Sequence, residues 1–277
     1  MSNTIFGWPL FSDVGVTYTP ALSGGSWLAA LPLTNVQDRR LARVARSADA
    51  AAASTTLTVD LGVARAVRVL SVLAPNLTKS AVPTLRWEGN SAAGFGGGTV
   101  VYDSTALACW PTGLTAEGAA GLNVWLTTVP SSDQTARYWR CSIVDTANVD
   151  GYLDLARLVI AGGFQPTINM QYGHGLGLES ESTRELTEGG AAIYGDRARR
   201  REAVFTIPNL PEAEAVGTFY VMQRLLGTTG QLFWVFDPID TTYLHQRAFL
   251  AVFRELSRME MASLQRYGIP CALVEEL

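Results

Sequence analysis

The chain contains 277 residues, and 48% of them are hydrophobic, which excludes disorder over most of its length. This length can hold one large or two ordinary domains with a buried core. The net charge of −4 gives no general reason to expect nucleic-acid binding.

The N-terminal residues 1–15 have neither the basic region nor the apolar core of a signal peptide. No apolar stretch of the chain approaches the roughly 18 residues that span a bilayer. The three cysteines, Cys109, Cys141 and Cys271, lack motif spacing, and strand-like surroundings predict that Cys141 and Cys271 are reduced and buried. We therefore expect a soluble protein that folds in a cytoplasm without a disulfide framework.

The first 165 residues are predicted to be all β. The segment "TTLTVDL" alternates, with Leu57, Val59 and Leu61 on one face, and "YWRCSIV" repeats this pattern with Trp139, Cys141 and Ile143. Short strands between turn-rich spacers are typical of a β-sandwich. The predicted strands are 55–61, 64–74, 122–129 and 138–144, with a Gly-rich loop at 90–98 and one helical turn within 33–53.

The loop "DTANVDG" at 145–151 is rich in carboxylate and amide oxygens, so it could be a calcium site, a catalytic pair or a turn. A calcium-binding loop of the helix-loop-helix type needs Glu at position twelve, and counting from Asp145 that position is Ala156. Asp and Asn also bond nearby backbone amides, and Asp-Gly is a favoured turn pair. We interpret the loop as a turn, with an irregular metal site as the minor alternative.

A break at 161–173, where Gly-Gly and Pro166 interrupt the strand pattern, separates two predicted domains, 1–165 and 166–277. The second domain starts with a polar hairpin over 172–202. A helix follows over 211–226, with Pro211 in its first turn and Gly227 as its C-cap. Its expected apolar stripe is Val216, Phe219, Met222, Leu225 and Leu226. The remaining predicted strands are 202–208, 231–238, 246–256 and 268–277, of which 246–256 also fits a helical period.

No motif brings catalytic or metal-binding residues together. The two histidines, His174 and His245, have no Cys or second His at ligand spacing, which argues against a zinc site. The segment "GHGLG" lacks the third Gly of a dinucleotide fingerprint, and the chain has no phosphate-binding loop or nucleophile elbow. An enzyme relying on carboxylates alone is the remaining catalytic alternative. We expect no catalytic residues, no cofactor and no metal ion.

The strongest charge feature is "GDRARRRE" at 195–202, with four arginines in five positions. It can be a solvated strand edge that discourages aggregation, a subunit interface that pairs with carboxylates, or a contact with nucleic acid. We favour the subunit interface. Its candidate residues are Arg197, Arg199, Arg200 and Arg201, and carboxylates such as Glu179, Glu181, Glu185 or Glu188 would pair with them.

Two aromatic residues in loops are candidates for ligand recognition. Trp110 lies in "LACWPTG", and Phe95 lies among glycines. An aromatic ring on a loop at one end of a sandwich can stack on a sugar ring, and it can equally cap the core. Both alternatives stay open for each residue.

The N-terminal half resembles a discoidin or galactose-binding-like jelly roll. In that family an Asn-containing loop precedes a strand ending in Asp-Leu-Gly, matched here by Asp60-Leu61-Gly62, and a late strand carries an aromatic-Arg pair, matched by Tyr138-Trp139-Arg140. The segments that carry the resemblance are 33–40, 56–62, 67–76, 136–145 and 155–162, within about half of the chain. The family's ligand residues vary, so the resemblance assigns no sugar-binding residue here.

The order of a polar hairpin, an Arg-rich strand, one helix and "QLFWVFDP" resembles distal tail and related baseplate subunits of tailed phages. The resemblance implies a tail-tube-like β-sandwich with one helix near 211–226, which forms a homo-oligomeric, sixfold ring below the tail tube. Tail tube, baseplate hub and tape-measure proteins would be its partners, at the tip of a virion assembled in the host cytoplasm. No membrane span and no specific nucleic-acid recognition are implied.

The resulting prediction is a mainly β protein, with an N-terminal jelly-roll sandwich and a C-terminal tail-tube-like sandwich. Its expected function is structural, in joining the tail tube to the baseplate hub or receptor-binding apparatus. The alternative function is carbohydrate binding for attachment to host-surface glycans. In an alternative arrangement, the first 20 or so residues pair with the second domain, and the jelly roll is an insertion.

Overall fold

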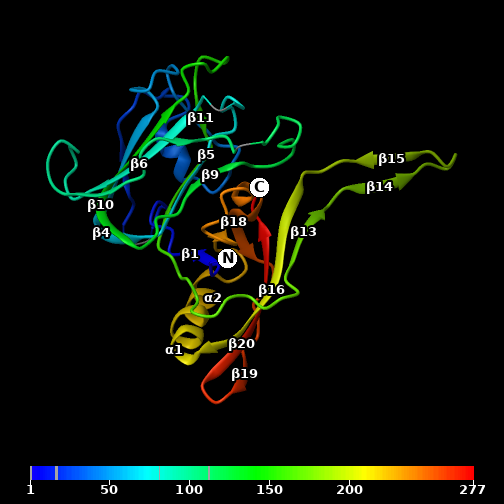
Figure 1. Ribbon diagram of the computed structural model, residues 1–277. Helices are drawn as coiled ribbons and strands as arrows, with labels where there is room; N and C mark the ends of the chain where they lie inside the picture. The colour runs from blue at the N-terminus through cyan, green and yellow to red at the C-terminus, as the bar shows by residue number, and fades with distance from the viewer. Residues whose placement is uncertain (1, 16–17, 81, 112) are drawn as a thin grey trace. The chain divides into compact units, whose positions relative to one another are not determined.

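The computed structural model describes residues 2–15, 18–80, 82–111 and 113–277. The predicted fold class is confirmed: the chain is mainly β, with antiparallel sheets and one helical segment of several turns among these residues (Figure 1). Two compact units are present. The first contains the residues up to Gln165 together with Leu232–Phe249, and the second contains Pro166–Gln231 and Leu250–Leu277.

The first unit contains a β-sandwich. Its larger sheet has the order β2 (Ala21–Ser23), β4 (Thr56–Val67), β10 (Gln134–Val144), β6 (Thr84–Asn90) and β7 (Val100–Asp103), and β8 (Leu107–Ala108) also pairs with β6. Its smaller sheet has the order β12 (Arg157–Ala161), β5 (Val69–Leu73) and β9 (Trp125–Thr128). A short ladder joins β3 (Ala45–Arg46) to β11 (Asp154–Leu155), and the predicted helical turn is a 3₁₀ helix over Leu33–Gln37.

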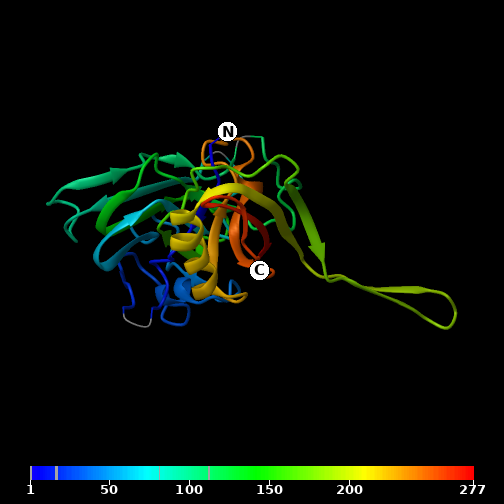
Figure 2. The same cartoon turned by 90° about the horizontal axis from the view of Figure 1, so that it is seen from below.

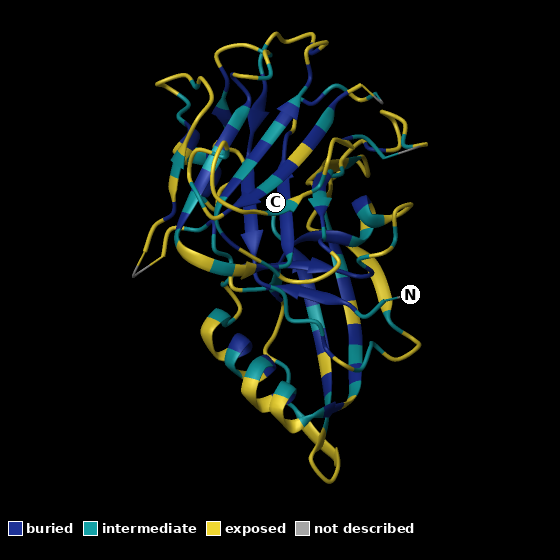
Figure 3. Cartoon of the chain, turned by 60° about the vertical axis from the view of Figure 1, so that its left-hand side comes forward, coloured by how far each residue is buried: buried dark blue, intermediate teal, exposed yellow. Residues whose placement is uncertain are grey.

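The core of the sandwich lies between the two sheets, where the strands carry most of the buried residues (Figure 3). The predicted alternation is confirmed on both central strands, because every second side chain of a strand points to the same face. On β4 the fully buried residues include Leu57, Val59 and Leu61, and on β10 they are Trp139, Cys141 and Ile143.

The two sequence motifs that carry the jelly-roll resemblance, Asp60-Leu61-Gly62 and Tyr138-Trp139-Arg140, lie on paired strands of the larger sheet. Tyr138 of β10 lies opposite Asp60 of β4, and the carboxylate of Asp60 pairs with the guanidinium of Arg137 at 2.7 Å. Gly62 has a φ of 75°, and a Cβ atom there would lie 2.6 Å from the Tyr18 ring. Only glycine accepts both conditions without strain. β4 therefore continues through Gly62 to Val67, beyond the predicted end at residue 61.

The pairing of the N-terminal strand differs from the predicted second domain, 166–277, because part of that range belongs to the first unit. β1 (Ile5–Gly7) pairs antiparallel with β17 (Leu232–Val235), and the Thr4 hydroxyl donates to the Val235 carbonyl at 2.9 Å. Residues 232–249 thus pack with the first unit, which includes a short helix, α3 (Leu244–Arg247). The expected boundary followed chain order, whereas this pairing joins strands more than 200 residues apart. The N-terminus does pair with a strand beyond residue 165.

The second unit is built on an antiparallel sheet. β16 (Arg199–Pro211) lies between β13 (Gly175–Ser180) and β20 (Arg266–Glu275). Residues 251–253 of β18 (Ala248–Phe253) and β19 (Glu260–Ser263) also pair with β20. The segment 246–256 therefore forms a strand over most of its length, and the predicted strand 268–277 is confirmed. β14 (Thr183–Leu186) and β15 (Ala192–Gly195) form a separate hairpin.

The predicted helix at 211–226 is confirmed. It consists of α1 (Glu212–Glu214), a π-helical segment (Ala215–Tyr220) and α2 (Val221–Leu226), and it ends at Gly227, whose φ is 57°. The expected apolar stripe is wrong in part, because Val216 and Leu225 are 41% and 62% exposed. The buried face is narrower and consists of Ala215, Phe219, Met222 and Gln223. Within the described residues, no helix is long and apolar enough to cross a membrane.

Candidate functional site

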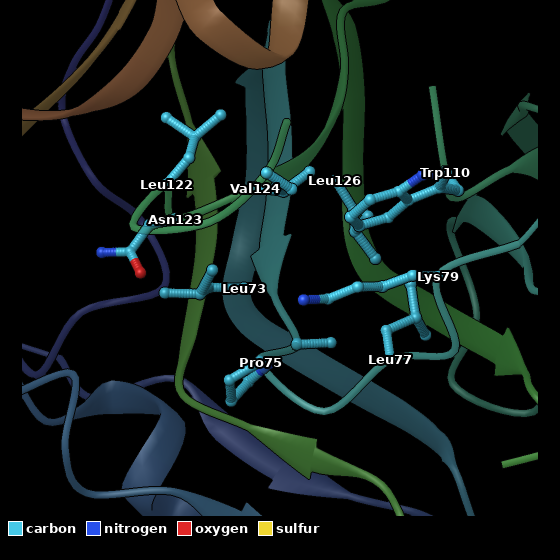
Figure 4. Close-up of a pocket in the computed structure, with 11 residues that line it drawn as sticks. Leu73, Pro75, Leu77, Lys79, Trp110, Leu122, Asn123, Val124 and Leu126 are labelled. Carbon is cyan, nitrogen blue, oxygen red and sulfur yellow. The ribbon is translucent and has the colours of Figure 1, made fainter. Parts of the chain in front are cut away.

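A pocket of about 110 Å³ opens on the first unit where the loops that follow β5 and precede β9 meet (Figure 4). Its apolar lining includes Leu73, Leu77 and Leu126, which are buried at the end of the sandwich core. Its aromatic and polar side chains include Trp110, Lys79 and Asn123. An aromatic ring, an ammonium group and an amide beside an apolar floor can bind a small polar ring compound.

Trp110 is held in place by its own loop. Its indole Nε1 donates to the carbonyl oxygen of Leu114 at 2.5 Å, so the ring is fixed and half-buried. The preceding residue, Cys109, is buried, and its backbone N–H donates to the Pro83 carbonyl at 2.9 Å. These bonds orient one of the two aromatic residues that the sequence singled out. Its contact with a glycan stays a prediction.

The loop at 145–151 positions the segment that carries Lys79. It is a turn, as interpreted from the sequence: the N–H of Asn148 donates to the Asp145 carbonyl at 3.1 Å. The Asp145 carboxylate accepts from the backbone N–H of Thr78 at 2.8 Å, and the Asn148 amide donates to the Asn76 carbonyl at 2.9 Å. Through these bonds the turn fixes the backbone of 76–78 at the mouth of the pocket. Sequence reasoning did not select Lys79, although it is the only lysine of the chain.

Phe95 lies apart from the pocket. The guanidinium of Arg140 covers its ring, with the Arg140 Cζ atom 4.3 Å from the ring centroid. Arg140 also pairs with Glu88 at 2.8 Å on the outer face of the larger sheet. One face of the Phe95 ring is thus engaged within the chain. The structure does not bring Phe95 and Trp110 into one site.

The four candidate interface arginines have different surroundings. Arg201 corrects the prediction, because its side chain is 7% exposed and forms an ion pair with the buried Glu275 of the same chain. Arg200 lies 3.4 Å from Glu181 at the surface, and Arg197 and Arg199 are exposed. A role of these three at an interface stays a prediction. Alternation along a strand does not identify which face neighbouring elements cover, so the sequence pattern alone does not show that Arg201 is buried.

The hairpin of β14 and β15, here called the ribbon (residues 183–195), extends beyond the sheet of the second unit (Figures 1 and 2). Within the described residues it forms a two-stranded sheet of its own. The exposed fractions of Leu186, Ile193 and Tyr194 are 64%, 59% and 68%. Sequence reasoning treated this segment as polar and missed these apolar side chains among its charges.

The described residues contain no group of three or more His, Cys, Asp or Glu side chains that could hold a metal ion. All three cysteines are free and buried, as expected for Cys141 and Cys271. Burial raises the pKa of Cys109 to about 12, and it also raises the pKa of Cys141 and Cys271. These thiols are protonated at neutral pH, so they are poor nucleophiles and metal ligands.

No family model matches the chain, and no curated protein matches it. Among solved structures, it is similar to a family 32 carbohydrate-binding module from a family 31 glycoside hydrolase of Clostridium perfringens. The identity is 13% and the TM-score is 0.37, covering 51% of this chain and 93% of that one.

The family 32 module of Clostridium perfringens NanJ, solved in complex with galactose, is similar at 16% identity and a TM-score of 0.37. The match covers 51% of this chain and 92% of that module. A family 32 module of AlyQ, in complex with 4,5-unsaturated mannuronic acid, is similar at 20% identity and a TM-score of 0.36, covering 50% and 92% of the two chains. Superpositions at this level carry no conclusion about a ligand of this chain.

Proposed function

We propose that this chain is a non-catalytic structural subunit of a larger assembly, in which the ribbon joins it to a neighbouring subunit. The ribbon is the observation that carries the proposal. An isolated two-stranded hairpin is at best marginally stable in water, because it has no third strand or helix to cover it. A neighbouring chain would supply the missing cover.

The composition of the ribbon supports the same conclusion. Its exposed apolar residues, Leu186, Ile193 and Tyr194, form the kind of surface that marks interaction sites when it is contiguous. Its edges also offer unpaired backbone groups to a further strand. Both signs of charge occur nearby, with Glu185 and Glu188 in the hairpin and Arg197 after it. A protein partner with mixed charges therefore fits this surface better than nucleic acid does.

The particular assembly is proposed from the sequence resemblance to distal tail and baseplate subunits. On this proposal the second unit contributes to a homo-oligomeric, sixfold ring at the tip of a phage tail. The ring would contact tail tube, hub and tape-measure proteins. Cryo-electron microscopy of the intact particle tests this placement directly, and a map that accounts for the tail tip without this chain would exclude it.

The assembly itself is tested with the purified full chain. The measurement is its mass by light scattering over a range of concentrations, for the wild type and for the double variant Ile193→Asn, Tyr194→Ser. The matched control is Val149→Asn, because Val149 is 97% exposed on a turn of the first unit. We expect oligomers of the wild type and the control, and their loss in the ribbon variant. A wild type that is monomeric at every concentration would refute the proposal, as would a ribbon variant that assembles normally.

A second function is carbohydrate binding by the pocket, and the fixed Trp110 ring favours it. Aromatic rings of this kind stack on the apolar face of a sugar. The pocket is small, at about 110 Å³. We therefore expect a weak single-site affinity, with a Kd on the order of 1 mM. Several copies in one assembly would raise the effective affinity by about 10²–10⁴.

Carbohydrate binding is tested with multivalent display of the full chain on a glycan array. We expect binding by the wild type and by Phe95→Ala, because Phe95 lies outside the pocket. Trp110→Ala removes the ring and should abolish binding. An array without signal for the wild type, or an unchanged signal for Trp110→Ala, would exclude this function.

A further inference from the structure

We propose that the pocket selects a sugar ring that carries an anionic group, a carboxylate or a phosphate. The inference rests on the proposed carbohydrate-binding function and deepens it. It starts from the position of Lys79, which is the only lysine among 21 basic residues of the chain. This single ammonium group lines the pocket, whereas none of the lining residues in the described part of the chain is Asp or Glu.

The arrangement of the pocket separates two kinds of contact. Figure 4 shows the Lys79 side chain extending across the pocket, with its amino group turned toward the side of Leu73 and Asn123. Trp110 offers a flat apolar surface on the same side, and Asn123 lies on the opposite side. A sugar ring stacked on Trp110 would place one ring substituent toward the ammonium group. An anionic substituent gains a charge-assisted hydrogen bond there, which a hydroxyl cannot match.

An ammonium group is a compact point charge with three rotatable donors, so it does not require the planar geometry that a guanidinium does. It can therefore donate hydrogen bonds to either a carboxylate or a phosphate.

Two carboxylates lie near the loop of Lys79 and limit the size of the effect. Asp145 is 2% exposed and accepts hydrogen bonds from Thr78 and Asn148, and Asp150 accepts from Asn76 at 3.1 Å. Neither carboxylate lines the pocket, but both reduce its positive potential. Lys79 is also exposed, so water and salt screen its charge. We expect a preference for the anionic ligand of about two- to fivefold, the range typical of a solvent-exposed ion pair.

The experiment is an NMR titration of the full chain at low ionic strength with three probes: methyl galactoside, methyl galacturonoside and galactose 6-phosphate. Three variants are compared with the wild type. Lys79→Gln removes the charge, and Lys79→Arg is the matched control that keeps it. Trp110→Ala reports whether the ring compound binds in the pocket at all.

We expect the wild type and Lys79→Arg to bind at least one anionic probe about two- to fivefold more tightly than the neutral one. Lys79→Gln should bind the anionic and neutral probes equally. The probe that shows the difference identifies carboxylate or phosphate as the preferred group. Added salt should reduce the preference without changing the affinity for the neutral sugar.

Equal affinity of the wild type for all three probes would overturn the inference and leave carbohydrate binding standing. A preference that persists in Lys79→Gln would overturn the assignment to Lys79. The absence of binding to any probe would overturn the inference, and the glycan array then decides separately whether carbohydrate binding stands.

Discussion

Replacing Glu275 by Gln is expected to destabilise the second unit by about 3–5 kcal/mol, the cost of removing one partner of a buried ion pair. Glu275 lies at the end of β20, directly across from Arg201 of β16. Its carboxylate accepts from the Arg201 backbone N–H at 3.0 Å and from Nε at 2.9 Å, and it also pairs with Nη2. The side chains of Arg201 and Glu275 are 7% and 2% exposed, so water cannot solvate the remaining charge. The full cost of an uncompensated buried charge therefore applies.

Replacing both partners of the ion pair should have a different effect on stability. In the double variant Arg201→Met, Glu275→Leu, apolar side chains of similar size fill the same space. Such replacements of buried ion pairs are often neutral or stabilising. We therefore expect the double variant to be more stable than Glu275→Gln, although it carries one further substitution. Arg199→Gln is the control on the same strand, and an exposed site of this kind should change stability by less than about 0.5 kcal/mol.

Amide hydrogen exchange of β16 and β20 is the suitable measurement. A chain with two units need not unfold in one step, and the seven tryptophans all lie in segments of the first unit, so their fluorescence would not report on the second. Exchange gives the local opening free energy of the two paired strands. A loss below about 1 kcal/mol in Glu275→Gln, or an equal loss in Arg199→Gln, would refute the reasoning.

Two further predictions concern the first unit. Hydrogen bonds from Arg86 lower the pKa of Asp103 to about 2, so the stability from this pair is complete above pH ~4 and is lost as the pH falls through about 2. Asp103→Asn should therefore show a shallower loss of unfolding free energy between pH 4 and 2 than the wild type, and parallel curves would contradict this. Gly62→Ala should cost about 1–2 kcal/mol in thermal or urea unfolding, because a Cβ at positive φ would also meet the Tyr18 ring. Gly97→Ala, at a position without positive φ and with open space around it, should leave stability unchanged, and an equal cost at both glycines would contradict this reasoning.

The strands with one buried face were predictable from the sequence. On β4 and β10 burial of one face imposes a two-residue period, which Leu57, Val59 and Trp139 display. The helix at 212–226 was predictable because its C-cap glycine marks its end. Its apolar stripe was less predictable, because helical spacing does not show how wide a face of the helix is covered. Val216 and Leu225 lie outside the covered face.

The sites were harder to predict, because tertiary structure assembles them. The pocket brings together residues near 73–79, a tryptophan at 110 and residues near 119–126. No local pattern joins these segments. Trp110 could be recognised as an aromatic residue in a loop. For Lys79 the only signal in the sequence is that the chain has no other lysine. The burial of Arg201 was also not visible, since its partner Glu275 lies 74 positions away.

The pairing of β1 with β17 has a consequence for synthesis on the ribosome. Ile5 and Phe6 emerge first, yet the strand that flanks them ends at Val235. Until most of the chain has been translated, these two residues lack the partner that makes them fully buried in the finished protein. A nascent N-terminal half would therefore expose the apolar segment around Ile5 and Phe6, to which chaperones can bind. The two sheets of the sandwich end at Ala161 and can form early, whereas β17, the strand that pairs with β1, is translated only later.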